Sequence, residues 1–454
     1  MIDTISKNEL EKWDKEFIWH PFTQMKDWIN DDISIIEKGE GVYLYDTHGR
    51  RYIDGISSLW VNVHGHRHPT INNAIKDQLD KISHSTLLGL SNVPSILLAK
   101  KLVEITPSSL KKVFFSDNGS TAVEVALKMA YQACQQRGLK KKKYFISFEN
   151  AYHGDTIGSV SVGGMDLFHK IYKPFLFNVL RCPAPYCYHC DNKIIVPHCA
   201  YNCLQKVSSI LAEKADEIIG VIVEPMIQCA AGMLTQPSGF MTELKSLCER
   251  YSVMLLVDEV ATGFGRTGNM FACNHENIDP DILVLAKGLT GGYLPIAATL
   301  TSQEIYDAFY GDYNEQKTFF HGHTYTGNPL GCVAAIKSLE LFEKEKTLEK
   351  LQPKIACTEE ALQPFYELAH VGDIRQCGFM VGIELVKDKE RRIPYNWDEK
   401  IGIKVIQEAR KRGVIIRPLG NVIVMMPPLV ITLSQLEELL NVIYESIKTV
   451  TEGS

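Results

Sequence analysis

The chain has 454 residues, of which 45% are hydrophobic and 22% are charged, a balance typical of an ordinary globular protein with a large core. A net charge of −6 argues against a nucleic-acid-binding surface. No stretch approaches the ~18 uninterrupted apolar residues of a membrane-spanning helix, and residues 1–10 carry charges where a signal peptide has its apolar core. We therefore expect a soluble cytoplasmic protein whose twelve cysteines stay reduced.

The elements predicted along the chain begin with a small sheet and continue as a helix–strand alternation. Residues 33–60 predict the sheet, because Val42 and Leu44 alternate with polar neighbours on either side of a turn at 46–49. From about residue 70, helices alternate with almost continuously apolar strands, which lie at 113–115, 144–148, 221–223, 253–257 and 282–285. Unbroken apolar strands interleaved with helices indicate a parallel sheet covered on both faces.

The last part of the chain predicts further α/β structure. A charged helical stretch from residue 341 leads to strands at 380–384 and 414–416 and to an amphipathic helix from Ser434. We predict an α/β protein with a large central domain, residues 71–340, whose sheet is mostly parallel. A smaller α/β domain would be made from both chain ends, residues 1–70 and 341–454, and residues 182–203 would be a cysteine-rich insertion.

Four polar motifs fall at strand ends or helix starts, where open α/β sheets place their ligands. In the first, a strand ends, Gly119 makes a tight turn, and Ser120 and Thr121 open a helix. Free backbone N–H groups and hydroxyls at a helix N-terminus can hold a phosphate, although Ser and Thr there are more often only caps.

The second and third motifs are an acid and a lysine at the ends of apolar strands. An acid such as Asp258 is often a helix cap, but a pyridoxal-5′-phosphate (PLP) enzyme needs a carboxylate against the pyridine nitrogen. Lys287 follows an apolar strand and precedes glycines, which suits an amine of lowered pKa that forms a Schiff base. The alternative for an isolated lysine is a surface position in a glycine-rich turn.

The fourth motif follows the strand that ends at Phe148. Tyr152 offers a flat face for a pyridine ring, and Asp155 offers a second carboxylate. Turn residues after a strand would look the same in isolation. The functional interpretation therefore depends on the four motifs occurring in order within one predicted domain.

Taken together, these motifs resemble the class III, or subgroup II, aminotransferases of PLP fold type I. The signature-like stretch is 258–268, followed by Lys287, and the resemblance covers nearly the whole chain. It implies a homodimer with two active sites at the subunit interface. It also implies that Thr324, with His323 beside it, reaches the cofactor phosphate of the neighbouring subunit.

Segments 19–25, 55–60, 63–66 and 416–420 are similar to the biotin-pathway branch of this family, which aminates 8-amino-7-oxononanoate to 7,8-diaminononanoate. The resemblance assigns the phosphate to Gly119 and Ser120, stacking on the ring to Tyr152, and the ring nitrogen to Asp258. The substrate-binding residues that it implies are Phe22, Leu59, Trp60, Tyr152, Asp155, Arg266, Lys287, Gly322 and Arg417. Arg417 would grip the substrate carboxylate, because a planar guanidinium binds a carboxylate bidentately.

The amino donor in this branch is S-adenosyl-L-methionine or L-lysine. Phe22, Leu59 and Val424 stand where Tyr, Trp and Tyr are usual in the branch, so each change removes a hydroxyl or an aromatic face. A sulfonium attached to adenosine would use such faces through cation–π attraction. We therefore predict that L-lysine is at least as good a donor as S-adenosyl-L-methionine.

Two alternative functions remain open from the sequence. The nearer one is another class III transaminase, which would act on ornithine, 4-aminobutyrate or another ω-amino acid. The other, from a different class, is a zinc-binding scaffold. The cysteines whose spacing resembles a structural zinc site are Cys187, Cys190, Cys199 and Cys203. His189 and His198 are two further possible zinc ligands. The alternative to a zinc site is a surface insertion whose thiols stay reduced.

Overall fold

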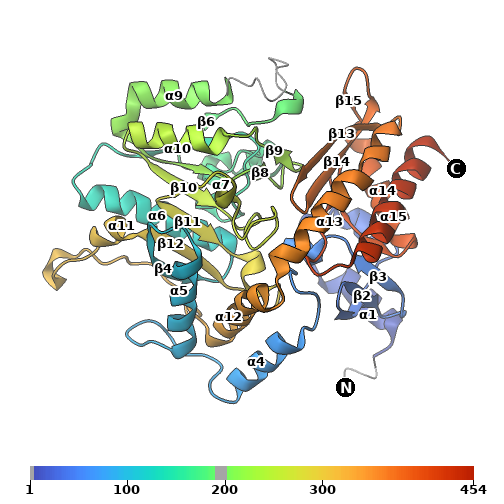
Figure 1. The fold of residues 1–454 in the computed structure, drawn as a ribbon, viewed down its shortest axis with the longest axis horizontal. Helices are drawn as coiled ribbons and strands as arrows, with labels where there is room; N and C mark the ends of the chain where they lie inside the picture. Colours follow the sequence, from blue (N-terminus) through green and yellow to red (C-terminus); the bar gives the residue numbers. More distant parts are fainter. Residues whose placement is uncertain (1–4, 190–201, 454) are drawn as a thin grey trace.

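A seven-stranded sheet forms the centre of the larger part of this computed structural model, which describes residues 5–189 and 202–453 (Figure 1). Its strands, in spatial order, are β4 (Leu110–Ser116), β12 (Ala297–Ser302), β11 (Ile282–Leu285), β10 (Met254–Asp258), β7 (Ile218–Val223), β5 (Tyr144–Phe148) and β6 (Leu180–Cys182). Only β12 runs antiparallel to its neighbours, so the sheet is mostly parallel, as predicted.

Both faces of this sheet are covered, and alternate residues of one strand enter different cores. In β10, Leu256 packs in the cluster on the side of α6, whereas Leu255 and Val257 belong to the other cluster. The helices of this part are α4 (Pro69–Leu79), α5 (Val93–Ile105), α6 (Gly119–Gln136), α7 (Ile157–Val162), α8 (Asp166–His169), α9 (Asn202–Lys214), α10 (Phe240–Arg250), α11 (Gln303–Asp307) and α12 (Pro329–Lys344). Two-sided burial explains why the strands are unbroken apolar runs in the sequence.

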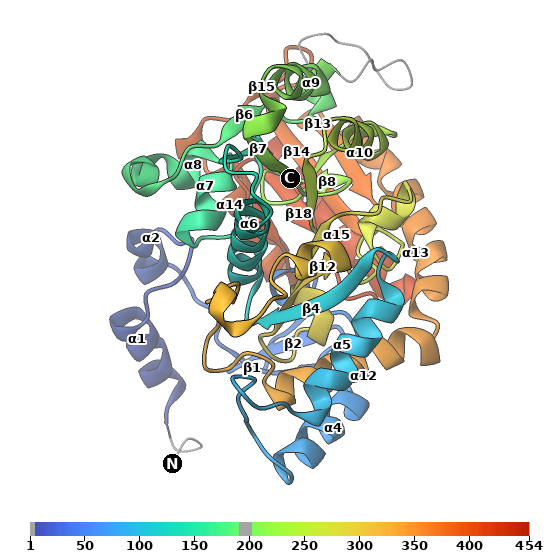
Figure 2. The same ribbon diagram turned by 90° about the vertical axis from the view of Figure 1, so that its left-hand side faces the viewer.

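The two ends of the chain share a sheet. Its strands are β1 (Ile36–Glu40), β2 (Tyr43–Asp46), β3 (Arg51–Asp54) and β16 (Val414–Ile415), and β16 pairs in parallel with β3. A second sheet contains β13 (Val371–Cys377), β14 (Met380–Asp388), β15 (Ile393–Pro394), β17 (Arg417–Leu419) and β18 (Val422–Met425). The helices beside these sheets are α13 (Thr347–Ala361), α14 (Ile401–Lys411) and α15 (Leu433–Glu452) (Figures 1 and 2). The proposed domain boundary at residue 340 falls inside α12 and stays a prediction.

The remaining elements are short. They are α1 (Lys7–Phe17), α2 (Met25–Asn30), α3 (Ser57–Trp60), β8 (Ile227–Gln228) and β9 (Leu234–Thr235). Among the residues that the structure describes, no helix is long and apolar enough to span a bilayer.

The α3 segment is a left-handed turn. Its four residues have φ of 52°, 48°, 74° and 68°, although none of them is glycine. The prediction that the small sheet continues to residue 60 is therefore wrong at its end, since β3 stops at Asp54 and the chain then turns. The buried Asp54 carboxylate accepts hydrogen bonds from the Ser58 backbone N–H (2.9 Å) and hydroxyl (2.8 Å), and these bonds hold the turn in place.

Candidate active site

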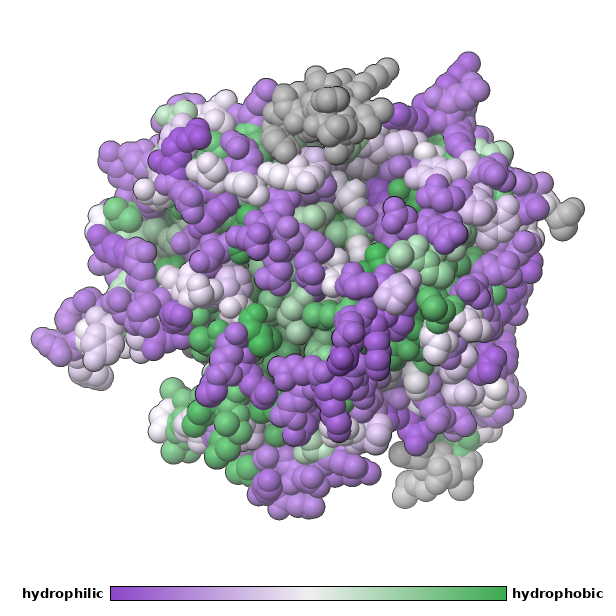
Figure 3. All heavy atoms as spheres, viewed as in Figure 1, coloured by the Kyte–Doolittle hydropathy of each residue, from purple (hydrophilic) through white to green (hydrophobic). Residues whose placement is uncertain are grey.

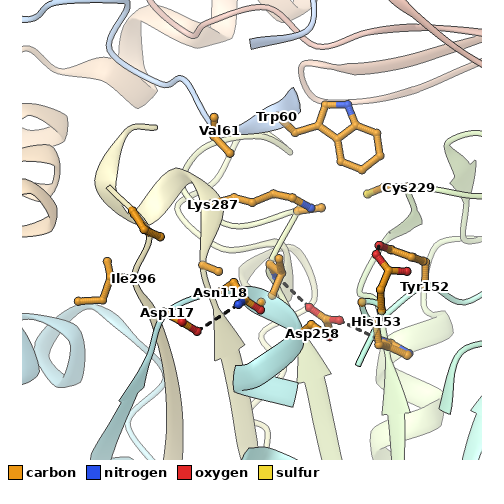
Figure 4. A pocket seen from close by; sticks show the side chains of 18 of the residues that line it. Trp60, Val61, Asp117, Asn118, Tyr152, His153, Cys229, Asp258, Lys287 and Ile296 are labelled. Atoms are coloured by element: carbon orange, nitrogen blue, oxygen red, sulfur yellow. Dashed lines mark hydrogen bonds and ion pairs between the residues drawn. The ribbon is translucent and has the colours of Figure 1, made fainter. Parts of the chain in front are cut away.

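A cavity of about 680 Å³ lies at the edge of the central sheet where five strands end (Figure 4). Strands β4, β5, β7, β10 and β11 all present their carboxyl ends at this edge. The lining residues at or just after those ends are, in chain order, Asp117, Gly119, Ser120, Tyr152, Glu224, Asp258 and Lys287. This edge is where open α/β sheets bind ligands.

Lys287 reaches into the cavity below the indole of Trp60. Its Nζ lies 4.9 Å from the centre of the Trp60 ring, and its backbone adopts a left-handed φ of 43°. Burial lowers the pKa of Lys287, while the nearby Cys229, Asp258 and Glu224 act in the opposite direction. A lysine of lowered pKa is a better amine nucleophile near neutral pH.

Asp258 lies at the floor of the cavity and is held by a histidine. His153 Nδ1 is 2.7 Å from Asp258 Oδ2, and the other carboxylate oxygen accepts the Val260 N–H at 3.0 Å. The His153 side chain is fully buried, and its Nε2 has no hydrogen-bond partner within the described part of the chain. His153 is not among the residues predicted from the sequence, although it stands next to Tyr152 in one of the four motifs.

The N-terminus of α6 forms one wall of the cavity. Asn118 caps this helix by accepting the Thr121 N–H at 3.0 Å, so neither Ser120 nor Thr121 is the N-cap. The Ser120 hydroxyl instead lies 2.8 Å from Thr156 Oγ1 and accepts the Thr156 N–H at 3.0 Å. A Cβ added to Gly119 would lie 2.5 Å from Val260 Cγ1, so a side chain here would require Val260 to move.

Tyr152 forms the opposite wall. Its hydroxyl donates to Asp155 Oδ2 at 2.6 Å, and burial raises the pKa of the phenol, which keeps it protonated. Its backbone N–H donates to Glu224 Oε1 at 3.0 Å. Glu224 is a second lining residue that the sequence analysis missed, and burial raises the pKa of its carboxyl to about 7.

Several predicted substrate residues do not line this cavity. Phe22 and Leu59 are exposed, and Phe22 packs edge-on against Phe168, which contacts Tyr152 in turn. Arg266 is fully buried and donates to the carbonyls of Pro427 (2.9 Å) and Asn62 (2.8 Å), so two of its three nitrogens are already engaged.

Arg417 and the segment 322–324 also lie outside the lining. The Arg417 side chain is half-buried, and within the described residues it has no hydrogen bond or ion pair. Gly322 and Thr324 are exposed, and His323 between them is half-buried. The structure thus brings together the predicted Lys287, Asp258, Tyr152, Asp155, Trp60, Gly119 and Ser120. The seven predicted positions outside the lining are Phe22, Leu59, Arg266, Gly322, His323, Thr324 and Arg417.

The proposed zinc ligands are only partly within the described residues. Cys190, Cys199 and His198 lie outside them. Over residues 5–189 and 202–453, no group of three or more His, Cys, Asp or Glu side chains is arranged to hold a metal ion. Cys182, in the same cysteine-rich stretch, is fully buried at the end of β6.

Comparisons with known proteins show the family to which this chain belongs. The family model described as aminotransferase class III matches residues 27–447. The adenosylmethionine-8-amino-7-oxononanoate aminotransferase of Geobacter sulfurreducens is 52% identical over 98% of both chains. The Aquifex aeolicus protein of the same name is 55% identical over 97% of this chain and 96% of its own. The crystal structure of the Methanocaldococcus jannaschii protein of that name superposes with a TM-score of 0.93, at 51% identity, and covers 98% of this chain and 99% of its own.

Proposed function

The chain belongs to the class III aminotransferases, which use PLP, and we propose that it transfers an amino group to 8-amino-7-oxononanoate to give 7,8-diaminononanoate in biotin biosynthesis. The observation that carries the substrate assignment is the identity of 52% and 55%, over nearly the full length of both chains, with relatives named for this reaction. The aminotransferase chemistry itself has independent support in the cavity, where a lysine, a carboxylate and a helix N-terminus converge.

The cavity fits PLP. Gly119 has no side chain, so the free N–H groups at the start of the 18-residue helix α6 stay open toward the cavity. A helix N-terminus with hydroxyls beside it suits the phosphate dianion. Asp258 would keep the ring nitrogen protonated, and His153 holds that carboxylate in place. Tyr152 would pack on the ring. When bound, PLP supplies an aldehyde that takes up the amino group and a ring that delocalises electrons.

Lys287 has two roles in this proposal. Its amine would attach covalently to the cofactor, and burial favours the neutral amine that this attachment requires. Once freed by a donor amine, Lys287 Nζ would act as general base and then general acid, and would move a proton at the substrate carbon. The indole of Trp60, 4.9 Å from Nζ, keeps water from one side of this amine.

We assign the substrate carboxylate to Arg417. A half-buried guanidinium without a partner in the described chain is a ready site for a bidentate anion. Arg266 is a less suitable group, because two of its nitrogens already bind backbone carbonyls; it stays a proposed contributor through its remaining Nε.

We also propose a homodimer in which Gly322, His323 and Thr324 serve the partner's site. Their position outside this chain's own cavity supports the idea. Further support comes from apolar side chains that stay exposed near the loop between α4 and α5, where Figure 3 shows an apolar surface. These side chains are Leu88, Leu90, Val93, Ile96 and Leu97. Light scattering should give twice the chain mass, and a monomer would exclude the shared site.

Steady-state assays with purified protein and added PLP test the substrate assignment. 8-Amino-7-oxononanoate should be aminated far faster than the keto or aldehyde partners of 4-aminobutyrate and ornithine. The reverse preference would make the protein an ω-amino acid transaminase. Arg417→Lys should raise KM for 8-amino-7-oxononanoate with a smaller change in kcat, because a lysine keeps the charge but loses the bidentate fork.

The amino donor is tested by mixing the PLP form with S-adenosyl-L-methionine or L-lysine and following the cofactor band. Leu59 and Val424, which stand where the branch usually has Trp and Tyr, leave fewer aromatic faces for adenosine, so L-lysine should bleach the band at least as fast. Bleaching by S-adenosyl-L-methionine alone would refute the lysine proposal. The relatives compared above are named for adenosylmethionine.

A structural zinc ion in the cysteine-rich insertion is a separate proposal, supported only by the spacing of its four cysteines. Elemental analysis of protein purified without chelator should find about one zinc per chain if four ligands form one tetrahedral site. Zinc well below that ratio would remove the idea, and neither result would affect PLP binding.

A further inference from the structure

Glu224 is a buried acid in the cavity to which the proposed chemistry gives no task. It directly follows β7, is 5% exposed, and lies among the lining residues. Its carboxylate is used by two different loops: Oε1 accepts the Tyr152 N–H at 3.0 Å, and Oε2 accepts the Cys229 N–H at 3.0 Å. The Tyr152 loop follows β5, and Cys229 follows the short strand β8, so a single side chain connects two separate parts of the cavity wall.

The backbone of Glu224 is itself fixed, so the carboxylate is a rigid link. The Glu224 carbonyl accepts the Gln236 side-chain N–H at 2.6 Å, and the Gln236 amide oxygen accepts the Met226 N–H at 2.8 Å. These bonds tie the β8–β9 hairpin to the end of β7. A movement of Glu224 would therefore shift Tyr152 and Cys229 together.

Only a carboxylate satisfies both loops. Each of its oxygens accepts a backbone N–H, whereas a glutamine would keep one acceptor and turn an NH₂ donor toward the other N–H. An unmatched buried N–H is unfavourable, so the substitution should loosen one of the two loops.

We propose that Glu224 is a positioning residue of this active site: its two carboxylate oxygens fasten the Tyr152 loop to the Cys229 loop and so fix the cavity wall against the cofactor ring. The proposal rests on the proposed PLP site, and it adds a residue that neither the four sequence motifs nor the assigned chemistry includes.

The surroundings of Glu224 connect this positioning to pH. The titratable groups that face it are His153, Asp258, Lys287, Tyr152 and Cys229. Burial raises the Glu224 pKa to about 7, with Asp258 adding to the rise and His153 and the two backbone N–H groups opposing it. Ionisation near neutral pH strengthens both N–H bonds and adds a negative charge beside Lys287.

The test compares Glu224→Gln with Glu259→Gln. Glu259 is a matched control, because it is also fully buried and its carboxylate also accepts two backbone N–H groups, those of Ala272 (2.8 Å) and Cys273 (2.7 Å), but it does not line the cavity. In the wild type, ionisation of Glu224 near neutral pH should change the visible band of the bound cofactor. In the Glu224→Gln variant, PLP affinity should fall roughly tenfold, and this change of the band should disappear. In the Glu259→Gln variant, Tm should fall while PLP affinity and the pH dependence of the band stay as in the wild type.

The proposal would be overturned if Glu224→Gln and Glu259→Gln lowered PLP affinity equally. It would also be overturned if a folded Glu224→Gln variant kept the wild-type PLP affinity and the wild-type pH dependence of the visible band. Glu224→Asp, which keeps both acceptor oxygens, should recover part of the lost affinity. Hydrogen exchange of the wild-type protein gives a second test that does not depend on variant folding: the amides of Tyr152 and Cys229 should exchange slowly, and rapid exchange at either would contradict the link. None of these measurements uses 8-amino-7-oxononanoate, so their outcome is separable from the substrate assignment.

Discussion

Lys287 is the residue on which the chemistry depends. Lys287→Ala should fold and bind PLP without covalent attachment, because the phosphate and ring contacts remain, but turnover should fall to the background rate. Borohydride reduction followed by peptide mass spectrometry should find the pyridoxyl group on Lys287 of the wild type and nowhere in the variant. A label on Lys142 or Lys354, two other lysines whose pKa burial lowers, would contradict the assignment.

His153 acts through Asp258. His153→Ala should lower kcat/KM roughly ten- to a hundredfold, because a hydrogen bond to a charged group contributes about 1.5–3 kcal/mol. His153→Asn, which can keep an N–H donor, should lose less. The visible band of bound PLP should shift in the alanine variant, since the ring nitrogen loses a fixed counter-charge. An unchanged spectrum and rate would show that Asp258 needs no partner.

Most residues that the sequence predicts and the structure brings together stand just after a strand or at a helix start, whereas Trp60 was predicted only from the family resemblance. Lys287, Asp258 and Tyr152 could be found in that way. His153 could not be assigned, because its importance comes from a hydrogen bond between loops that lie far apart in the sequence. Glu224 carries the same signal as Asp258, an acid at the end of an apolar strand, but its link between two loops could not be read from the sequence.

At the scale of elements, the left-handed turn of α3 is the most strained segment near the site. Left-handed helical residues other than glycine are disfavoured by roughly 1–2 kcal/mol each, so the turn must be held by its surroundings. Asp54 does this through Ser58 and also lies 2.9 Å from His66 Nε2. Asp54→Ala should lower the free energy of unfolding by about 1–3 kcal/mol, because it leaves buried donors unmatched.

Chemical denaturation measures that loss, and Leu59→Gly serves as the comparison. Glycine adopts the left-handed φ of Leu59 without steric penalty, so this variant should keep the wild-type stability. An Asp54→Ala variant with wild-type stability would show that contacts other than the Asp54 carboxylate hold the turn and keep Trp60 over Lys287.

Most elements near the site were predictable, because strand and helix patterns depend on local burial. The strands at 144–148 and 282–285 occur with those bounds. Strand β12 was not predicted at all, and its antiparallel direction could not have been, since a strand buried on both faces has the same pattern in either direction. The left-handed turn was missed because it contains no glycine and is imposed by tertiary contacts.

At the scale of the whole molecule, buried histidines make stability depend on pH. Burial lowers the pKa of His64 to about 3 from 6.5, so the folded protein keeps this ring neutral while the unfolded chain binds a proton below pH 6.5. The unfolded state then holds more protons, and the stability that His64 contributes is lost as pH falls from 6.5 toward 3. Tm of the wild type should therefore fall more steeply with acid than Tm of His64→Gln. Parallel Tm curves would contradict this assignment.

The single-turnover half-reaction tests the central claim most directly. The pyridoxamine form of the purified protein is mixed with 8-amino-7-oxononanoate, the return of the PLP band is followed, and the product is identified by mass spectrometry. We predict 7,8-diaminononanoate in stoichiometric amount from the wild type and none above background from Lys287→Ala. No product from the wild type, together with rapid reaction of an ω-aldehyde such as succinic semialdehyde, would contradict the proposed function.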